Sequence, residues 1–473
     1  MRAAVLRLAV GSLMALARRR AAPRSQFAKT GATIRGVRST DLALATMRCS
    51  LQDVFAAHFD TYAQQRSLHP RQWRAAQCIR SCYTAACGSH FVTCPQGHFS
   101  HEQFHACGHR SCPRCADTTR AAWIDAELGR LLPCPHFHVV FTLPHELLSL
   151  WEFNREVFIR MLFDSVRLSL LQLLADPRHL GATPGLLMSL HTWGRDLSHH
   201  PHVHALVSAG GLTPDLRWRP TRAGFLLPLK PLRRLFAGKL LAALRAALAE
   251  DALRLPPQQP RTHWQTLLRT LYRKHWNIQI NPAYDSGRSV TLYLARYAKG
   301  GPLPKQRALS MNATSVSFEY TDHRDNRSKQ MTLEPHAFIS RILWHAPPKG
   351  VHTVRHAGLY ATAAKRHHRS ASVALTLPKF PALIESDSHS QNHAPRSNSA
   401  PLCPVCNNPL ERSFSRSSPM TQRAKNQIPL LESVSPLQHP SRIQLTSRPN
   451  PSFKPTDNGE LPGPSYRYGV HCL

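Results

Sequence analysis

Apolar residues recur along the chain with two different periods, and together these predict a mixture of helices and strands. Spacings of three and four residues, typical of helices with one buried face, run through 51–87, 118–132, 147–174, 229–253 and 288–299. Runs rich in β-branched and aromatic residues predict strands at 136–143, 185–192, 202–208 and 278–280, and a hairpin from 315–320 and 330–333. Helices and strands therefore share the part of the chain between about residues 50 and 335.

Apolar periodicity is weak at both ends of the chain. After about Leu377, Ser, Pro, Asn and Arg dominate, and a segment of this composition buries too little apolar surface to fold. Residues 1–46 are basic and show little periodicity, so we expect a disordered extension and a true start at Met47. No segment reaches the ~18 consecutive apolar residues of a membrane span, so we expect no membrane partner.

The charge of the chain is strongly positive. It carries 60 Lys and Arg against 27 Asp and Glu, a formal charge of +33. An excess of this size favours a polyanionic partner, of which DNA and RNA are the commonest. A basic membrane-surface protein is disfavoured because no long amphipathic basic helix stands out. The composition therefore predicts a nucleic-acid-binding protein.

Seven of the 12 cysteines lie between Cys78 and Cys115, and histidines are interleaved with them. This clustering is typical of a metal site in a reducing compartment rather than of a disulfide framework, so we expect a cytoplasmic, nucleoid-associated protein. The pair Cys112-Pro-Arg-Cys115 supplies two ligands from one turn. We expect Cys94 and Cys107 to complete a tetrahedral zinc shell, with His98 as the main competitor for a place.

The zinc ion expected here is structural, because enough ligands exist to close its shell. Arg110 and Arg114 lie beside the Cys112–Cys115 turn and are candidates for contacts with DNA phosphates. A solvated basic face is an equally good interpretation of these two arginines.

His202-Val203-His204 opens a predicted strand, in which alternate side chains share a face. The two imidazoles therefore project together, about 6–7 Å apart along the strand, and could hold one divalent ion. Two polar residues on a solvated face are the simpler alternative. The sequence frames of metallo-β-lactamase-type hydrolases and of amidohydrolases, which also use a His-x-His pair, are absent. A second pair, His136 and His138, begins an earlier strand and could supply a third ligand.

Tyr293 and Tyr297 lie four residues apart in the predicted helix 288–299, so both hydroxyls share one face. A tyrosine can attack a phosphodiester and store its energy as a phosphotyrosine, provided that a metal polarises the phosphate. Packing is the commoner role of such a pair, and the nucleophilic interpretation gains weight only from the histidine pair and the charge. Arg296 and Lys299 are candidates for holding phosphates.

These features, in this order, resemble the two-tyrosine transposases of the insertion-sequence-91 family, which belong to the HUH superfamily of single-strand endonucleases. The resemblance covers about residues 48–365. The matching stretches are CGSHFVTCPQGHFSHEQFHACGHRSCPRCA, HFHVVFTLPHELL, LHTWGRDLSHHPHVHALVSAGGL, YLARYAKGGP and FISRILWHAPPKGVHTVRHAGLY.

The resemblance implies an α+β fold, in which a small helical zinc-binding module precedes an HUH-type antiparallel sheet with flanking helices. It implies that His202 and His204 hold a catalytic Mg²⁺ or Mn²⁺ and that Tyr293 and Tyr297 are the nucleophiles. The expected reaction is rolling-circle transposition: one strand of single-stranded or melted DNA is nicked, a 5′-phosphotyrosine forms, and strand transfer follows. Trp193 is a candidate for stacking on a base.

The resemblance also divides the chain into four expected parts. These are a basic extension over 1–46, a DNA-binding zinc module over 47–130, a two-tyrosine catalytic domain over 131–365 and a mostly disordered tail over 366–473. The tail contains Cys403-Pro-Val-Cys406, which resembles a further zinc knuckle without a partner pair in the sequence. Many relatives have Cys-Pro-x-Cys-Gly where this chain has Cys94-Pro-Gln-Gly-His98, which makes His98 a candidate replacement for a missing sulfur.

A non-catalytic, zinc-dependent DNA-binding protein, or an inactive copy of the element, is the alternative function. The transposase and the non-catalytic protein both predict salt-dependent DNA binding. Only the transposase requires the two tyrosines and the two strand histidines, and their joint presence favours it.

Overall fold

The computed structural model describes residues 47–285, 291–292, 300–304, 307–322, 325–376 and 401–416. Between these residues, every pair of neighbouring strands is antiparallel, and helices lie among the strands without a regular βα repeat. The α+β class with an antiparallel sheet is therefore confirmed. None of the helices in this described part of the chain combines the length and the apolar character that crossing a bilayer requires.

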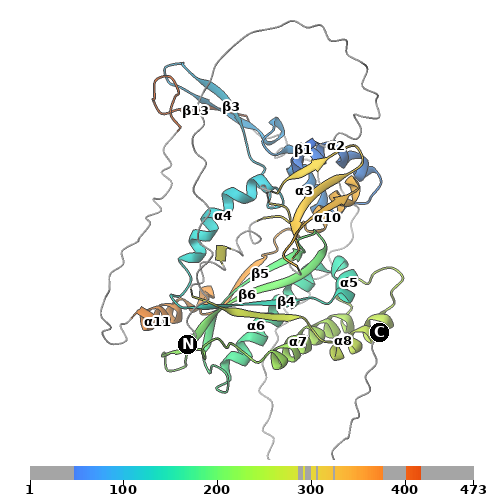
Figure 1. Ribbon diagram of the computed structural model, residues 1–473, viewed down its shortest axis with the longest axis vertical. Coiled ribbons are helices and arrows are strands. Elements are labelled where there is room, and N and C mark those ends of the chain that lie inside the picture. The colour runs from blue at the N-terminus through green and yellow to red at the C-terminus, as the bar shows by residue number, and fades with distance from the viewer. Residues whose placement is uncertain are drawn as a thin grey trace, which may run out of the picture. The chain divides into compact units, whose positions relative to one another are not determined.

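The central feature of the fold is a six-stranded antiparallel sheet in the order β12-β5-β6-β4-β8, with β7 paired to β6 (Figure 1). Its strands are β4 (His136–Thr142), β5 (Thr183–Trp193), β6 (His199–Leu212), β7 (Trp218–Pro220), β8 (Ile278–Tyr284) and β12 (Val354–Gly358). Strand β6 lies between β4 and β5. Consequently the side chains of its central part, His202–Val207, have neighbours from both of these strands.

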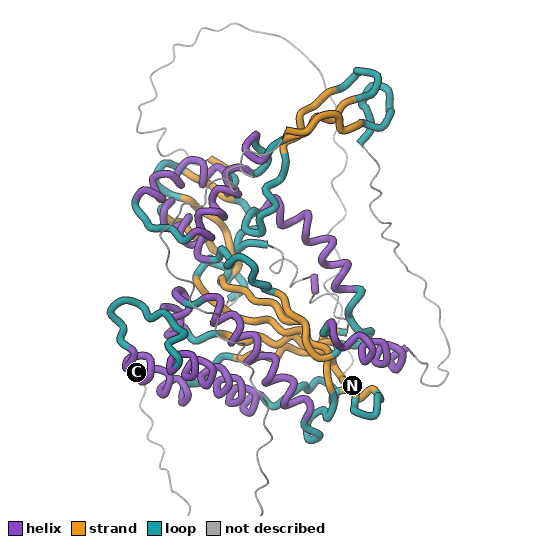
Figure 2. The backbone as a smooth tube through the Cα atoms, turned by 180° about the vertical axis from the view of Figure 1, so that it is seen from behind, coloured by secondary structure: helices purple, strands orange, loops and turns teal. Residues whose placement is uncertain are grey.

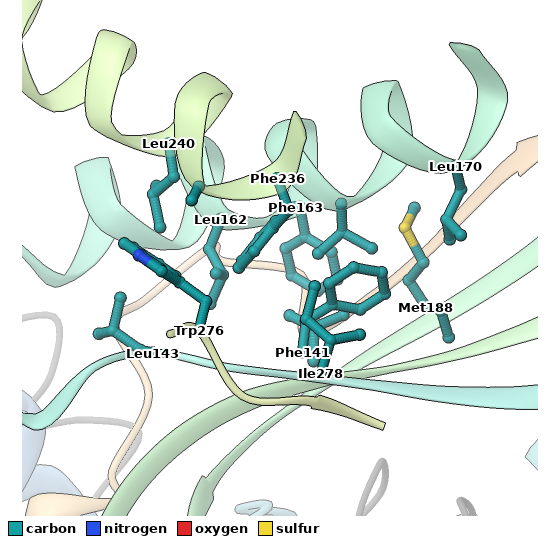
Figure 3. Close-up of a cluster of buried hydrophobic side chains, with 14 of the residues drawn as sticks. Phe141, Leu143, Leu162, Phe163, Leu170, Met188, Phe236, Leu240, Trp276 and Ile278 are labelled. Carbon is teal, nitrogen blue, oxygen red and sulfur yellow. The ribbon is translucent and has the colours of Figure 1, made fainter. Parts of the chain in front are cut away.

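Four helices cover one face of this sheet, as both views of the chain show (Figures 1 and 2). They are α5 (Leu148–Phe153), α6 (Arg155–Ala175), α7 (Leu229–Ala249) and α8 (Arg261–Arg273), with the short 3-10 helix η2 (His145–Leu147) ahead of α5. Alternate residues of β6, namely Val203, Ala205 and Val207, point into the core beneath the helices. Figure 3 shows Phe236 of α7 in this core, in ring contact with Phe141 of β4 and with Trp276.

The predicted helix 147–174 is interrupted at Asn154, which separates α5 from α6. The Asn154 side-chain amide donates to the carbonyl oxygens of Leu150 at 2.9 Å and Arg254 at 2.8 Å, and its oxygen accepts from the Arg254 N–H. An asparagine that bonds to nearby backbone groups in this way competes with the helix. Here it also ties the helix junction to the loop between α7 and α8.

The other face of the sheet is covered at one end by α11 (Lys365–Thr376), which follows the short helix η3 (Thr362–Ala364). Tyr360 is buried there, in ring contact with His136 of β4 and so close to Gly185 that a Cβ at this glycine would lie 2.6 Å from its ring. The Leu132 N–H donates to the Tyr360 hydroxyl, which donates to His136 Nε2 at 2.6 Å. His136 Nδ1–H in turn donates to the Cys134 carbonyl. Each polar group of this buried chain is therefore paired.

A second core joins the N-terminal helices to residues much later in the chain. Helices α2 (Leu51–Gln64) and α3 (Pro70–Ser81) begin with capping boxes, at Ser50 and His69 respectively. They pack with α10 and with a four-stranded sheet in the order β1-β9-β10-β11. Bounds of these elements are β1 (Met47–Cys49), β9 (Leu309–Met311), β10 (Val316–Thr321), β11 (Ser328–Leu333) and α10 (Pro335–Trp344).

This shared core differs from the boundary that we expected near residue 130. Phe55 and Phe59 of α2 are buried with Phe318 of β10 and Phe338 of α10. The module assigned to 47–130 therefore has no separate apolar core, because α2 and α3 need the later sheet and helix to cover their apolar faces.

A third, three-stranded sheet has the order β13-β2-β3. Its strands are β2 (Ser89–Thr93), β3 (Ser100–Phe104) and β13 (Glu411–Arg416). In sequence, β2 and β3 lie between the short helix η1 (Ala85–Cys87) and α4 (Pro113–Leu128), whereas β13 is the last strand of the described chain. Strand β13 and helix α11 fall inside the segment 366–473 that we expected to be mostly disordered, so that expectation is wrong for 366–376 and 401–416. Residues 1–46, 377–400 and 417–473 lie outside the described residues.

We predict that Tyr360→Phe lowers the free energy of unfolding by about 1–3 kcal/mol, because it leaves the Leu132 N–H and His136 Nε2 buried without a partner. Urea unfolding followed by circular dichroism measures this change. The matched control is Tyr272→Phe, whose side chain on α8 is exposed and should leave stability unchanged. Equal stabilities of both variants would contradict the structural role of the Tyr360 hydroxyl.

We also predict that stability falls as the pH is lowered from about 6.5 to about 4. Burial lowers the pKa of His136 to about 4, whereas an unfolded histidine titrates near 6.5. Between these values the unfolded chain binds the proton and the folded chain does not, which costs up to about 3 kcal/mol from this residue. The free energy of unfolding of His136→Gln, measured by urea unfolding between pH 7 and 5, should depend less steeply on pH than that of the wild type, by about one bound proton. An unchanged pH dependence would contradict the lowered pKa of His136.

A histidine cleft, two cysteine groups and the family of the chain

Three histidines gather on the sheet face opposite the helices. His202 and His204 of β6 share that face, and the register places His191 of β5 directly opposite His202. The ring centroids of His191 lie 5.4 Å from His202 and 4.1 Å from His204, and one nitrogen from each ring lies within 4.8 Å of the other two. These three side chains could therefore hold one metal ion between them.

A hydrogen-bonded chain leads from this group across two further strands. His204 Nδ1 lies 2.7 Å from His138 Nε2 of β4, and His138 Nδ1 lies 3.0 Å from the Asn281 side-chain nitrogen of β8. His138 therefore contacts a candidate ligand but is not part of the ligand group. We had expected the third ligand from His136 or His138. The structure places His191 there instead, and it keeps His136 in the Tyr360 network.

The hydrogen bonds also bear on the protonation of the rings. His202 Nδ1–H donates to the His200 carbonyl at 2.5 Å, which leaves Nε2 with a lone pair for a metal. Burial lowers the pKa of His202 to about 4, and burial together with the neighbouring imidazoles lowers the pKa values of His191 and His204 well below the usual range. All three rings are therefore neutral at pH 7, the form that binds metals.

The three histidines open into a cleft of about 830 Å³. Of the described residues that line it, three are arginines and none is acidic; the arginines are Arg120, Arg195 and Arg307. Trp193 also lines the cleft and stacks on His191, with ring centroids 5.7 Å apart and planes at 15°. A cleft with this lining favours an anionic ligand that carries flat rings.

The cysteines form two groups instead of the single set that we expected. Cys82, Cys107, Cys112 and Cys115 make the first group, with the Cys115 sulfur 3.5 Å from those of Cys82 and Cys107. Cys94 and His98, which we had placed with Cys107, belong to a second group with Cys403 and Cys406. The expected set of Cys94, His98, Cys107, Cys112 and Cys115 is therefore divided.

The β2–β3 hairpin is the physical reason for this division. Backbone hydrogen bonds from Tyr83 to His105 and from His105 to Gly88 bring Cys82 to the base of the hairpin, beside Cys107. Cys94 follows β2 and lies at the opposite end. Five strand residues, at about 3.3 Å each, separate the two ends. A sulfur at the tip cannot reach an ion at the base.

Comparison with known proteins identifies the family. A family model described as "Putative transposase" matches residues 185–368, and one described as "Transposase zinc-binding domain" matches residues 54–143. The putative transposase y4qJ of Sinorhizobium fredii is 35% identical over 313 residues, which are 65% of this chain and 79% of that protein. The transposase for insertion sequence element IS801 of Pseudomonas savastanoi is 31% identical over 291 residues, which are 59% of this chain and 68% of that protein.

The chain belongs to the insertion-sequence-91 family of transposases. No solved structure matches this transposase. The two family models cover the three cleft histidines, Cys94, His98 and the first cysteine group, whereas Cys403 and Cys406 lie outside both.

The structure describes only some of the other residues predicted to contact DNA or to act as nucleophiles. Arg110 is half-buried and donates to the Thr353 hydroxyl at 2.8 Å, and desolvation lowers its pKa; its contact with DNA phosphates stays a prediction. Arg114 is exposed, with its guanidinium 4.3 Å from the centre of the Tyr83 ring, and it remains a candidate for DNA contact. Tyr293, Arg296, Tyr297 and Lys299 lie outside the described residues.

Sequence reasoning missed His191 and Cys82. Ser189 and His191 are alternate polar positions of the predicted strand 185–192, between the apolar Met188 and Leu190, and this pattern could have indicated His191. No comparable signal marks Cys82, because it lies near several other cysteines and only the pairing at the base of the hairpin selects it.

We predict that His191→Ala weakens Mn²⁺ binding to the cleft as much as His202→Ala does, because both imidazoles belong to the same ligand group. His138→Ala should cost less, about 10- to 100-fold in affinity, since His138 contacts the ligand His204 without joining the group. Calorimetric titration of the zinc-loaded protein measures the three affinities. Unchanged Mn²⁺ binding in His191→Ala would contradict the proposed third ligand.

Proposed function

We propose that this transposase cuts one DNA strand with a tyrosine and transfers it through a 5′-phosphotyrosine, at an HUH-type site built on β5 and β6. The observation that carries the proposal is the trio His191, His202 and His204, neutral at pH 7, in a cleft lined by arginines. Family membership supplies the general activity, transposition, and the trio supports the chemistry by which it proceeds.

The position of the predicted nucleophiles supports this mechanism through their described neighbours. Strand β8 precedes the segment that contains Tyr293 and Tyr297, and its Asn281 lines the histidine cleft. Gly301 and Pro302 follow the segment, and they line the same cleft. Described residues on both sides of the two tyrosines in sequence therefore line the histidine cleft.

The donor set fits a divalent ion. Three neutral imidazoles within 4.8 Å of one another suit Mn²⁺ better than Mg²⁺ in ligand softness, and they leave coordination positions for phosphate oxygens. An ion bound by His191, His202 and His204 would polarise the scissile phosphate and stabilise the negative charge that develops on it. The Asn281–His138–His204 chain orients one of these rings.

The remaining chemistry belongs to the tyrosine. Its phenolic oxygen bonds to phosphorus, the bond from phosphorus to the 3′ oxygen breaks, and a proton ends on the 3′ hydroxyl that leaves. A 3′ hydroxyl of the recipient strand then attacks the phosphotyrosine, which restores a phosphodiester and releases the tyrosine. The second tyrosine is available for the second cut.

The cleft favours single-stranded or melted DNA. Arg120, Arg195 and Arg307 supply positive charge along it, and Trp193 offers a ring on which a base can stack.

We further propose that the cysteine group of Cys82, Cys107, Cys112 and Cys115 holds a structural zinc ion, because four sulfurs close a tetrahedral shell.

The deciding experiment incubates the full chain with Mn²⁺ and end-labelled single-stranded DNA of random sequence, and then looks for a covalent adduct that survives denaturation. We expect the adduct on Tyr293 or Tyr297 by mass spectrometry. It should disappear with EDTA, in the Tyr293→Phe/Tyr297→Phe double variant and in His202→Ala. Tyr272→Phe, an exposed tyrosine on α8, is the matched control and should leave the adduct unchanged.

Two outcomes of this experiment would contradict the proposal. An adduct that persists in the double tyrosine variant would assign the nucleophile elsewhere. Absence of any adduct, in a zinc-loaded protein that still binds DNA with strong salt dependence, would favour the non-catalytic DNA-binding protein or an inactive element copy.

A further inference from the structure

Residues 401–416 form an ordered part of the chain that lies outside both family matches. Strand β13 at the end of this segment pairs with β2, in a register that joins Glu411 to Thr93 and Arg416 to Ser89. Ahead of β13, a bridge between Leu402 and Pro409 closes a tight turn. More than 300 residues separate the paired strands in sequence. An interaction beyond the strand pairing is therefore needed to keep this segment against the N-terminal hairpin.

Over residues 401–412, whose side chains the structure describes, apolar packing does not hold the segment. No described side chain of 401–412 belongs to any of the three apolar cores, and Leu402 and Val405 are 51% and 69% exposed. Cys403 is the exception, since it is buried to 1% exposure. A short strand and a turn without a core are marginally stable in water, so the burial of this one sulfur points to a further interaction.

The turn at Cys403 has a counterpart at Cys94. The Cys94 N–H donates to the Phe99 carbonyl at 2.8 Å, and the Cys403 N–H donates to the Asn408 carbonyl at 2.8 Å. Each turn also contains one residue in the left-handed region, Gly97 at φ 78° and Asn407 at φ 61°, which glycine and asparagine tolerate best. The two turns therefore present their ligand pairs, Cys94 with His98 and Cys403 with Cys406, in a similar way.

The distances between these four side chains suit a single zinc ion. The Cys94 sulfur lies 3.5 Å from the Cys406 sulfur and 3.9 Å from His98 Nδ1, and all four ligand atoms lie within 4.8 Å of one another. A tetrahedral zinc with bonds of about 2.3 Å to sulfur separates its sulfurs by about 3.8 Å. A disulfide is excluded at this geometry, because its sulfurs would be about 2.05 Å apart.

We propose that Cys94, His98, Cys403 and Cys406 bind a second zinc ion, which fastens the segment 401–416 to the N-terminal hairpin. Three thiolates and one imidazole close the shell, so the ion is structural, and its binding releases the thiol protons to solvent. The site uses none of the cleft histidines or tyrosines, so it stands independently of the proposed strand transfer.

Metal content of the full chain tests this proposal. We expect two zinc ions per chain by mass spectrometry of the metal. Cys406→Ser and Cys94→Ser should each reduce the content to one, and the double variant should also retain one, because both sulfurs serve the same ion. Cys112→Ser should remove the other ion. Cys49→Ser, a half-buried cysteine of β1 outside both groups, is the matched control and should retain two.

His98 offers a second, conservative comparison. His98→Cys should retain two zinc ions, because a sulfur replaces the imidazole, whereas His98→Ala should lose the second ion during dialysis against a weak chelator. Cobalt substitution distinguishes the two forms, since the visible absorption of bound Co²⁺ changes when a fourth sulfur replaces nitrogen. Identical cobalt spectra of the wild type and His98→Cys would exclude His98 as a ligand.

Amide hydrogen exchange tests the fastening itself. In Cys406→Ser, protection of 411–416 should fall to that of an unfolded peptide, while α2 keeps its protection because its core is untouched. A single zinc ion in the wild type, or full protection of 411–416 in Cys406→Ser, would overturn the proposal. A zinc-dependent dimer by light scattering would overturn it too, because Cys403 and Cys406 would then serve a second chain.

Discussion

Strand β6 imposes the constraint on which the rest of the structure depends. It is paired on both sides, by β4 and β5, so the direction of every one of its side chains is determined. One face must be apolar because α6 and α7 cover it, and Val203, Ala205 and Val207 meet that need. The intervening positions are thereby turned to the opposite face, where His202 and His204 meet His191. The same alternation that builds the core thus assembles the histidine group.

The two faces of this sheet have different chemical roles. Beneath the helices, apolar side chains are close-packed, and this packing gives the strands a rigid register. On the other face, burial removes water from the imidazoles and keeps them neutral at pH 7, which prepares them for a metal before one is bound. A rigid support of this kind suits the proposed strand transfer, because catalysis of phosphoryl transfer depends on the position of charges more than on covalent chemistry.

Contacts between distant parts of the sequence recur throughout this transposase. Helices α2 and α3 share a core with β10 and α10, β1 pairs with β9, and β13 pairs with β2. The N-terminal zinc-binding region therefore shares its apolar core with later elements of the chain. It is held by elements that follow the predicted tyrosines, which offers a direct physical route by which DNA contacts in one region could influence the other.

The sequence by itself determined the elements whose signal is local. Runs of β-branched and aromatic residues predicted β4, β5 and β6, the helical spacing predicted α2, α3 and α7, and the α+β class followed from the family resemblance. The pair His202 and His204 was predictable because two residues of one strand need no tertiary information to share a face. Helices α8 and α10 were not predicted, and the interruption at Asn154 depends on a carbonyl of Arg254, one hundred residues away.

Only the tertiary structure decided which side chains meet. His191 joins the histidine pair through the register of β5 on β6, and His138 contacts His204 because β4 pairs on the other side. Spacing along the chain suggested one zinc set, whereas the hairpin holds its two ends apart and gives Cys82 to one group and Cys94 to another. Cys403 and Cys406 lie beside Cys94 and His98, although about three hundred residues separate the two pairs in sequence. The physical reason is common to all of these: spacing in sequence predicts proximity only within one element, and between elements it is strand pairing and packing that set the distances.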